Sequence, residues 1–226
     1  MKKKNIVHVI TRLINGGADE NTVISCNYSI SVGNNVSLIM GSNADKEILN
    51  KLDKKVNLIT VKNLIRSINP YKDILALIHV RKEIKKLSPD IVHTHTSKAG
   101  FIGRLAAWLS GVPLIVHTVH ILPFINENFI MKILYLLLEK LIAIVTDKYI
   151  NVSSGMMETS LRYKVGTQAK HNIIYSAFDT LKFRDAIYSN NLNELSVNKK
   201  IFKNKKIILM IGAFEKRKRH RELVDI

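Results

Sequence analysis

Short apolar runs alternate along the chain with longer stretches in which apolar residues recur at helical spacing. The short runs are rich in β-branched residues and are bounded by glycine, proline or polar residues, which is typical of strands buried in a parallel sheet. This alternation predicts an α/β fold with a Rossmann-like parallel sheet flanked by helices. The predicted strands are Asn5–Ile10, Val36–Met40, Val56–Thr60, Asp90–His95, Val112–Val119, Lys148–Val152 and His171–Tyr175.

Six stretches between these runs predict helices. Their expected bounds are Glu20–Ser31, Lys46–Leu52, Tyr71–Leu87, Gly100–Ser110, Phe129–Thr146 and Gly155–Tyr163, the last with Ser153 as N-cap. The third of these helices is amphipathic, with an apolar face and a face rich in lysine and arginine. We interpret its basic face as a solvated surface over the sheet, with docking on anionic lipid as the alternative. The expected apolar face consists of Ile74, Leu75, Ile78 and Ile84.

The stretch Phe129–Thr146 is the most apolar long run in the chain. It contains Lys132, Glu139 and Lys140, so it is too short and too charged to span a bilayer comfortably. We expect it to be a core helix or an interface helix.

Two predicted strands in the middle of the chain end in histidines. His93 and His95 close the first of them, and His117 and His120 close the second. Ligands of open parallel sheets bind at the carboxyl ends of the strands. We therefore expect the chemistry in the loops 94–99 and 120–126.

The histidines could also serve structure alone. His93 and His117 alternate with apolar residues inside their strands, so we expect them to be packed or hydrogen-bonded within the fold. His95 and His120 are the better functional candidates. A zinc site built from all four is the alternative, but no cysteine or carboxylate joins them at ligand spacing, so we predict no metal.

A glycine pair, Gly16-Gly17, lies between the first predicted strand and the first predicted helix. Glycines let backbone amides approach a ligand closely, and a helix N-terminus attracts anions, so a phosphate would suit this position. The loop lacks the GxGxxG pattern and therefore carries no dinucleotide fingerprint. A tight turn that requires positive φ explains the glycines equally well.

Composition narrows the class of protein further. The chain has 226 residues, of which 46% are hydrophobic, and a formal net charge of +17. Such a charge attracts anions, but no helix-turn-helix, zinc finger or aromatic RNA-binding pattern accompanies it, so we expect no nucleic-acid partner. The single cysteine, Cys26, excludes an internal disulfide and is expected to be a packed thiol.

The sequence pattern also predicts location and domains. Polar residues follow Met-Lys-Lys-Lys too soon for a signal peptide, so we expect a cytoplasmic protein, with peripheral contact to the inner face of the membrane as an option. We expect one domain over residues 1–183 and a polar linker over 184–206. The apolar run Ile207–Ile211 and a helix from Glu222 would then begin a second domain, which we predict to be truncated because its strand has no partners.

Several motifs in order resemble the N-terminal, acceptor-side half of GT-B glycosyltransferases, and specifically the family 4 sugar transferases of bacterial polysaccharide synthesis. The most specific is HTHTSKAGFIGRLAAWLSGVPLIVHTVH at 93–120, which is similar to the acceptor-domain block of that family. The others are Gly16-Gly17-Ala18-Asp19, Val152-Ser153-Ser154-Gly155-Met156, Ile174-Tyr175-Ser176-Ala177-Phe178-Asp179 and Ile211-Gly212-Ala213-Phe214 with Lys218.

The resemblance implies an enzyme that moves a sugar from a nucleoside-diphosphate sugar to a lipid-linked or polysaccharide acceptor, with retention and without a metal or other cofactor. It implies donor-phosphate contacts at Gly16, Gly17 and Lys218 and a catalytic role for His120, which would position the reacting groups. The loop with His95, Thr96, Ser97 and Lys98 would contact the acceptor.

The two glutamates of the family's E-x7-E pair, which hold the nucleotide sugar, would fall beyond residue 226. We therefore predict little or no transfer by this chain alone, and a separate donor-domain chain is one expected partner. The alternatives are a non-catalytic basic module that binds anionic membrane or nucleic acid, and a degenerate remnant.

Overall fold

The computed structural model describes residues 2–125, 127–177, 180, 206, 208–212, 214 and 218–225. The chain divides after Ala177 into two units. The first unit carries the sheet, its helices and nearly all of the candidate residues, and it is described first.

The first unit contains a seven-stranded sheet in which every neighbouring pair is parallel. The strands are β1 (Asn5–Ile10), β2 (Asn35–Met40), β3 (Asn57–Thr60), β4 (Ile91–His95), β5 (Leu114–Val119), β6 (Lys148–Asn151) and β7 (His171–Ile173). Their order across the sheet is β3-β2-β1-β4-β5-β6-β7. The fold class predicted from the sequence is thereby confirmed.

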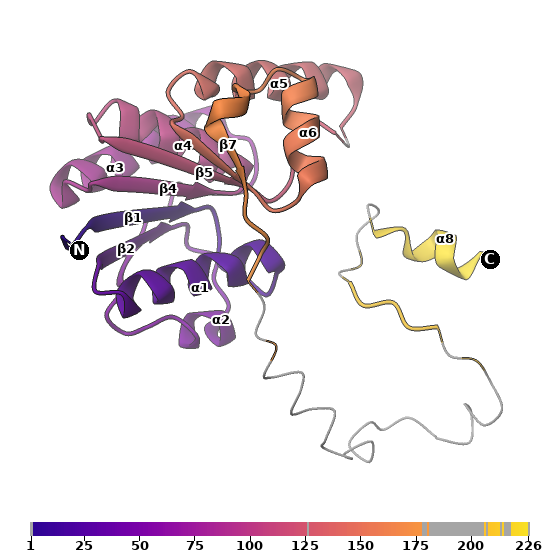
Figure 1. Ribbon diagram of the computed structural model, residues 1–226, viewed down its shortest axis with the longest axis horizontal. Helices are drawn as coiled ribbons and strands as arrows, with labels where there is room; N and C mark the ends of the chain where they lie inside the picture. Colours follow the sequence, from indigo (N-terminus) through magenta and orange to yellow (C-terminus); the bar gives the residue numbers. More distant parts are fainter. Residues whose placement is uncertain are drawn as a thin grey trace, which may run out of the picture. The chain divides into compact units, whose positions relative to one another are not determined.

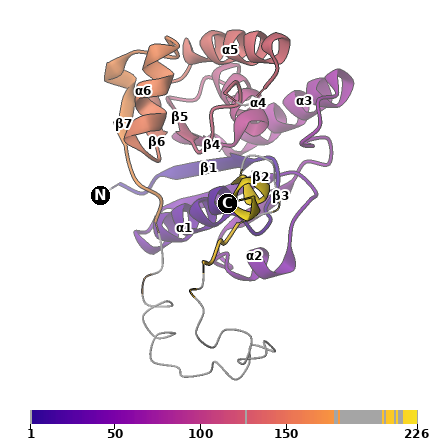
Figure 2. The same cartoon turned by 90° about the vertical axis from the view of Figure 1, so that its right-hand side faces the viewer.

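Helices cover both faces of this sheet. They are α1 (Gly17–Ser31), α2 (Lys46–Asn50), α3 (Pro70–Leu87), α4 (Ser97–Trp108), α5 (Phe129–Ala143) and α6 (Ser154–Arg162), with a 3-10 turn at Gln168–Lys170. Figures 1 and 2 show α3, α4 and α5 on one face and α1 and α2 on the other. Buried side chains therefore line both faces of the central strands.

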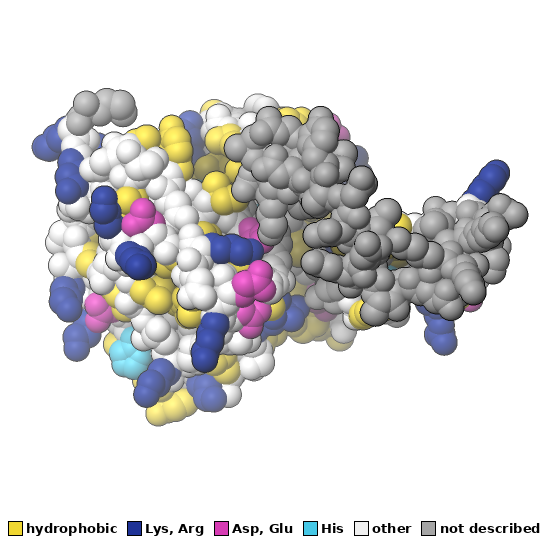
Figure 3. Space-filling model, turned by 90° about the horizontal axis from the view of Figure 1, so that it is seen from below, with side chains coloured by type: hydrophobic (Ala, Val, Ile, Leu, Met, Phe, Trp, Pro, Cys, Tyr) yellow, Lys and Arg dark blue, Asp and Glu magenta, His cyan; other side chains and the backbone are white. Residues whose placement is uncertain are grey.

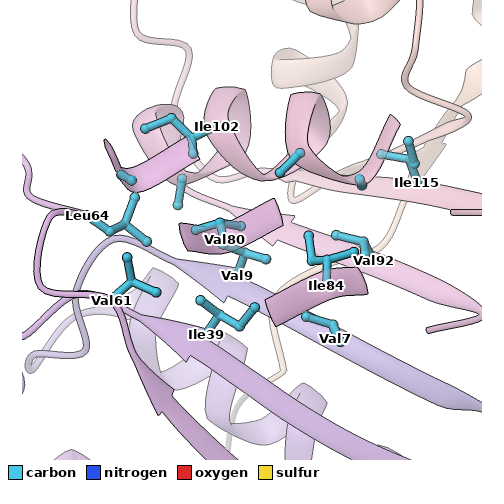
Figure 4. Packing of buried hydrophobic residues seen from close by; sticks show 14 residues of the cluster. Val7, Val9, Ile39, Val61, Leu64, Val80, Ile84, Val92, Ile102 and Ile115 are labelled. Carbon is cyan, nitrogen blue, oxygen red and sulfur yellow. The ribbon is translucent and has the colours of Figure 1, made fainter. Parts of the chain in front are cut away.

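The larger core lies between the central strands and the α3–α4 layer. Figure 4 shows Val7, Val9 and Val92 of the sheet facing Val80 and Ile84 of α3. A second cluster packs under α1, where Cys26 is fully buried, and burial raises the pKa of its thiol to about 12. Cys26 is thus the packed thiol that the sequence predicted.

Strand β1 has β2 on one side and β4 on the other, so the strand order reverses direction between β1 and β4. Loops that follow two such strands run to opposite faces of the sheet and leave a crevice at its carboxyl edge. The register pairs His8 of β1 with His93 of β4. This edge is where the sequence placed the chemistry.

Two sequence predictions about helices need correction. α4 begins at Ser97, three residues before its predicted start. Thr11, which follows β1, accepts a hydrogen bond from the Ala99 N–H and so caps this earlier first turn. The predicted apolar face of α3 is also wrong in part, since Ile74 and Ile78 are exposed. α3 packs along α4 with Ala76, Val80 and Ile84, so its buried stripe is rotated from the face that hydrophobicity alone indicates.

The second unit is described only in part. Residues 208–211 form no strand and are exposed, and a short helix α8 follows at His220–Val224. A lone apolar run has no ladder partner within the described residues, so the strand expected there does not form. The predicted linker, 184–206, lies outside the described residues except for Lys206.

Among the described residues, no helix is long and apolar enough to cross a membrane. Figure 3 shows lysine and arginine side chains in excess over carboxylates on the face seen from below, as the net charge implies.

Candidate functional site

The carboxyl edge of the sheet is tied together by Thr11, the first residue after β1. Its Oγ1 accepts a hydrogen bond from the Ala99 backbone N–H at 3.1 Å and lies 3.1 Å from Oγ1 of Thr96. Thr11 therefore caps α4 from a neighbouring strand and joins the two loops that flank the crevice. Sequence reasoning missed this role, because a cap from another element leaves no local signal.

Thr96 occupies a strained backbone conformation at this crevice. Its φ of 61° and ψ of 163° lie in a region that is essentially reserved for glycine. Such strain costs on the order of 1–3 kcal/mol and persists only where the surroundings over-determine it. Thr96 is held by its side-chain contact with Thr11 and by its carbonyl, which accepts from the Gly100 N–H at 2.8 Å. A strained residue beside a ligand crevice supports a functional interpretation of this loop.

Four histidines gather on one face of the sheet at the same edge. His8 Nδ1 lies 3.0 Å from His95 Nε2, and His95 Nδ1 lies 3.4 Å from His120 Nε2. His93 packs beside the rings of both His8 and His95, and its Nε2 forms a hydrogen bond with the Thr118 hydroxyl at 2.7 Å. The sequence did not indicate His8, although its register with His93 follows once β1 and β4 are known to be neighbours.

His117 faces the opposite side of the sheet, where its Nδ1 forms a hydrogen bond with the Thr94 hydroxyl at 2.9 Å. The zinc site considered from His93, His95, His117 and His120 therefore cannot form, because adjacent strands direct these side chains to different faces. The prediction that His93 and His117 are hydrogen-bonded within the fold is confirmed.

Burial controls the charge of this cluster. Loss of solvation lowers the pKa of both His8 and His120 to about 4, and it holds the pKa of His93, His95 and His117 well below the usual range. The imidazoles are therefore neutral at physiological pH. Of the three hydrogen-bonded histidines His8, His95 and His120, only His120 is partly exposed. It presents a neutral imidazole to the crevice.

The glycine loop does not need its glycines for backbone geometry. Gly16 is extended, with φ of −177°, and Gly17 is absent from the positive-φ residues, so the tight-turn interpretation is wrong. A Cβ at Gly17 would meet nothing within 4 Å. Open space above Gly17 leaves the N-terminus of α1, which no side chain caps, accessible to a ligand.

Two carboxylates, Asp19 and Glu20, lie in the first turn of α1, and a Cβ at Gly16 would lie 3.0 Å from Oδ2 of Asp19. Asp19 is buried and accepts a hydrogen bond from the Ile14 N–H at 3.3 Å, and burial is the main cause that raises its pKa. Glu20 pairs with Lys51 at 3.1 Å. The ion pair with Lys51 reduces the repulsion that Glu20 would exert on an approaching anion, whereas the Asp19 carboxylate lies beside Gly16.

A pocket of about 640 Å³ opens at the same edge, between the loops that follow β1, β2 and β3. Arg12 and Arg66 contribute two cations to it, and its apolar wall includes Tyr135 of α5. Sequence reasoning missed both arginines, although their positions just after predicted strands could have indicated them. The full lining is Thr11, Arg12, Ser42, Asn43, Leu64, Ile65, Arg66, Ser67, Ile68 and Tyr135.

Lys98 holds one part of the pocket wall in place. Its ammonium forms an ion pair with Asp73 at 2.7 Å and a hydrogen bond to the carbonyl of Ser67, which lines the pocket. Gly41 allows the wall to close, since a Cβ there would collide with the carbonyls of Leu64 and Thr11. The acceptor contact predicted for Lys98 remains a prediction, and the structure gives this side chain a positioning role.

The remaining predicted site residues are distributed as follows. Ser97 begins α4 beside Thr96, and His95 is fully buried beneath His120, so a ligand would reach His95 only through His120. Lys218 is exposed and belongs to the second unit. Gly16, Gly17, Thr96 and His120 all follow the carboxyl ends of strands, after β1, β4 and β5, so the structure places them at the same edge of the sheet.

Residues 7–181 match the model of Glycosyltransferase Family 4. The chain belongs to this family. It is 36% identical over 162 residues to the Escherichia coli UDP-Gal:alpha-D-GlcNAc-diphosphoundecaprenol alpha-1,3-galactosyltransferase, a match that covers 71% of this chain and 41% of the relative. A shorter match, 44% over 57 residues, links it to a Colwellia psychrerythraea pyrophosphoryl-undecaprenol N-acetylglucosamine transferase, covering 25% of this chain and 15% of that protein.

Solved structures share the fold at low sequence identity. A glycosyltransferase from Rickettsia africae has a TM-score of 0.63 at 21% identity, covering 90% of this chain and 49% of that one. Anabaena HepE in complex with UDP and glucose has a TM-score of 0.62 at 15% identity, covering 82% and 50%. The match of this family 4 chain thus spans about half the length of these structures and 41% of the Escherichia coli relative.

Proposed function

We propose that this chain is the acceptor-binding half of a retaining glycosyltransferase that extends a lipid-diphosphate-linked saccharide in cell-surface polysaccharide synthesis. The observation that carries the proposal is the pocket at the carboxyl edge, whose lining contains two arginines together with apolar side chains. An acceptor with a diphosphate between a saccharide and a lipid matches such a pocket. The Escherichia coli relative is named as a transferase that acts on an acceptor of this kind, GlcNAc-diphosphoundecaprenol.

Arg12 and Arg66 would bind the acceptor's diphosphate. Guanidinium groups form paired, charge-assisted hydrogen bonds to phosphate oxygens and keep their charge at any physiological pH. Ile65, Ile68 and Tyr135 would contact the first part of the lipid. The saccharide would then extend toward Thr96 and Ser97 at the start of α4.

The exposed surface of helix α5 is consistent with an acceptor that is anchored in a membrane. Apolar residues at helical spacing along it remain exposed, although Tyr135 on the same helix lines the pocket. An exposed apolar stripe with lysines nearby is suited to lie in the lipid interface. We therefore assign peripheral contact with the inner face of the membrane to α5 rather than to α3. The stripe consists of Phe129, Ile130, Ile133, Leu134, Leu137, Leu141 and Ile144.

The donor would approach from the other side of the crevice. The amides at Gly16 and Gly17 would face the diphosphate of a nucleoside-diphosphate sugar. The leaving-group role of Lys218, which belongs to the second unit, stays a prediction. His120 would hydrogen-bond a sugar hydroxyl near the reacting carbon. The proposal assigns neither a metal nor another cofactor to the chain.

The test measures binding of a short-chain prenyl-diphosphate N-acetylglucosamine to the 226-residue chain. We expect the double variant Arg12→Gln, Arg66→Gln to bind at least about tenfold more weakly, since each charge-assisted hydrogen bond contributes about 1.5–3 kcal/mol. Lys86→Gln, which removes an exposed charge at the end of α3, is the matched control and should bind normally.

Three outcomes would contradict parts of the proposal. Unchanged affinity in the double variant would remove the arginines from acceptor binding. Salt-dependent binding to arbitrary duplex DNA, equal to acceptor binding, would favour a basic module without catalytic function. Sugar transfer by the 226-residue chain alone would contradict the division into an acceptor half and a donor-binding partner.

A further inference from the structure

His8, His95 and His120 form a chain of hydrogen-bonded imidazoles that begins in the core and ends at the crevice. The ring centres of His8 and His95 are 5.3 Å apart and their facing nitrogens 3.0 Å apart. For His95 and His120 the two distances are 5.7 and 3.4 Å. In both pairs the distance between ring centres exceeds the distance between the facing nitrogens by two imidazole ring radii. The facing nitrogens therefore lie on the line that joins the two ring centres.

This head-on geometry suits a shared proton and does not suit a metal ion. The ring nitrogens of His8, His93 and His95 come within 4.8 Å of one another, which by distance alone would allow a metal site. Zinc lies about 2.0–2.1 Å from each histidine nitrogen, so two nitrogens that point directly at each other would need about 4 Å between them. The 3.0 Å between His8 and His95 leaves room for a proton only.

Counting protons leaves two arrangements for the chain. Three neutral imidazoles carry three N–H groups, and each of the two contacts uses one of them. The third proton then sits at one end, either on His8 Nε2 or on His120 Nδ1. His8 Nε2 is buried and has no hydrogen-bond partner among the described residues.

The environment at the two ends decides between these arrangements. An N–H buried without an acceptor is rarer in proteins than an acceptor without a donor, because its desolvation is not compensated. His8 is 1% exposed and His95 is 0% exposed, whereas His120 is partly exposed. The third proton therefore belongs on His120 Nδ1, where water or a ligand can accept from it.

We propose that His8 and His95 are positioning residues that hold His120 in its Nδ1–H form, so that His120 meets the substrate as a neutral hydrogen-bond donor and not as a base. In this arrangement His8 Nδ1–H donates to His95 Nε2, and His95 Nδ1–H donates to His120 Nε2. This inference rests on the proposed function for the place of His120 at the reaction. Its physical content, the tautomer, is independent of any transfer activity.

The consequence for chemistry is specific. His120 Nε2 is occupied by His95, so only Nδ1 remains for a ligand. An Nδ1–H group can bond a sugar hydroxyl or a phosphate oxygen, and it cannot remove a proton from the acceptor hydroxyl. The base for that proton must then come from elsewhere, and the donor sugar's own leaving diphosphate is a group of suitable chemistry.

The test is the tautomer of each histidine, measured at neutral pH by long-range ¹H–¹⁵N correlation on the ¹⁵N-histidine-labelled 226-residue chain. We expect His8, His95 and His120 to show a protonated Nδ1 and a bare Nε2. His171 is the internal reference of the opposite kind, since its Nε2 donates to the Val165 carbonyl at 2.9 Å. A His120 with a protonated Nε2 in the wild-type chain would overturn the proposal.

Two variants of His8 separate positioning from packing. His8→Leu removes the donor, so His95 can reverse and His120 should shift toward the Nε2–H form. His8→Asn is the matched control, because its amide nitrogen can replace Nδ1 as donor to His95, and it should retain the wild-type tautomer. A folded His8→Leu chain in which His120 is unchanged would also overturn the proposal. If that variant does not fold, the wild-type spectrum still decides.

These outcomes are distinct from those of the acceptor-binding test. The tautomer pattern is read without donor or acceptor present, so it can hold while acceptor binding fails. Conversely, acceptor binding that depends on Arg12 and Arg66 can hold while His120 carries its proton on Nε2.

Discussion

Strained or buried charged residues raise the free energy of the folded state, and contacts with neighbouring residues compensate for it. Thr96 adopts a strained backbone, and its contact with Thr11 holds it there. Arg104 of α4 is fully buried, and it meets Glu139 of α5 at 2.9 and 3.2 Å. Its remaining donors bond the Tyr149 and Thr146 hydroxyls and the Gly100 carbonyl. Thus the charge buried between α4 and α5 is fully paired.

Removing one partner of this buried pair should be costly. We predict that Glu139→Ala lowers the free energy of unfolding by about 3–5 kcal/mol, because Arg104 would keep a buried charge without a counter-ion. Urea unfolding of the 226-residue chain is the measurement. Glu20→Ala breaks the exposed pair with Lys51 and should cost only about 0–1 kcal/mol. Equal costs for the two variants would show that Arg104 does not depend on Glu139.

At the scale of elements, α5 differs from the other helices in what it leaves exposed. The sequence predicted a core or interface helix, and its described residues have only Glu139, Ile142 and Ala143 buried. α5 therefore packs on α4 by a narrow stripe centred on the ion pair. Its outer face is the apolar stripe from Phe129 to Ile144.

We predict that this stripe binds lipid. The double variant Ile130→Ser, Leu137→Ser should reduce co-sedimentation with vesicles that contain anionic lipid by at least about fivefold, since each buried apolar side chain contributes about 1.5–3 kcal/mol. Ile74→Ser, Ile78→Ser on α3 removes two exposed apolar residues from another helix and serves as the matched control. Loss of binding in the α3 variant alone would instead restore the alternative that the sequence left open for that helix.

At the scale of the whole molecule, the histidines make stability depend on pH. The pKa values of His8, His93, His95, His117, His120 and His171 are all lowered, chiefly by burial. Their unfolded value is about 6.5, so below that pH the unfolded chain binds more protons than the folded chain. The contribution of these histidines to the free energy of unfolding is therefore fully present above about pH 6.5 and is lost as the pH falls toward 4.

The expected result is a steep fall in the free energy of unfolding between about pH 7 and pH 5, measured by urea titration at intervals across that range. His8→Asn removes one buried titrating group and should make the fall shallower. His79→Asn, a change on the exposed face of α3, is the control and should leave the slope unchanged. A stability that does not vary over this range would contradict the neutral, buried state of the cluster.

The sequence by itself determined the elements and their order in this family 4 chain. In the first unit, all seven strands and six α-helices were predicted, with bounds that differ from the structure by about three residues at most. This succeeded because buried β-branched runs, helical spacing and caps such as Ser153, which accepts from the Met156 N–H at 3.2 Å, are local signals. The motifs also placed the chemistry at the carboxyl edge, where Gly16, Gly17, Thr96 and His120 lie.

Only the tertiary structure decided which side chains meet there. The placement of β1 beside β4 brings His8 to His95 and Thr11 to Thr96, across 87 and 85 residues. The same folding turns Lys98 toward Asp73 and leaves Arg12 and Arg66 in the pocket. Local sequence tells which face of a strand is buried, because side chains alternate with a period of two. It does not tell which strands are neighbours, and that choice depends on the free energy of the whole packed sheet.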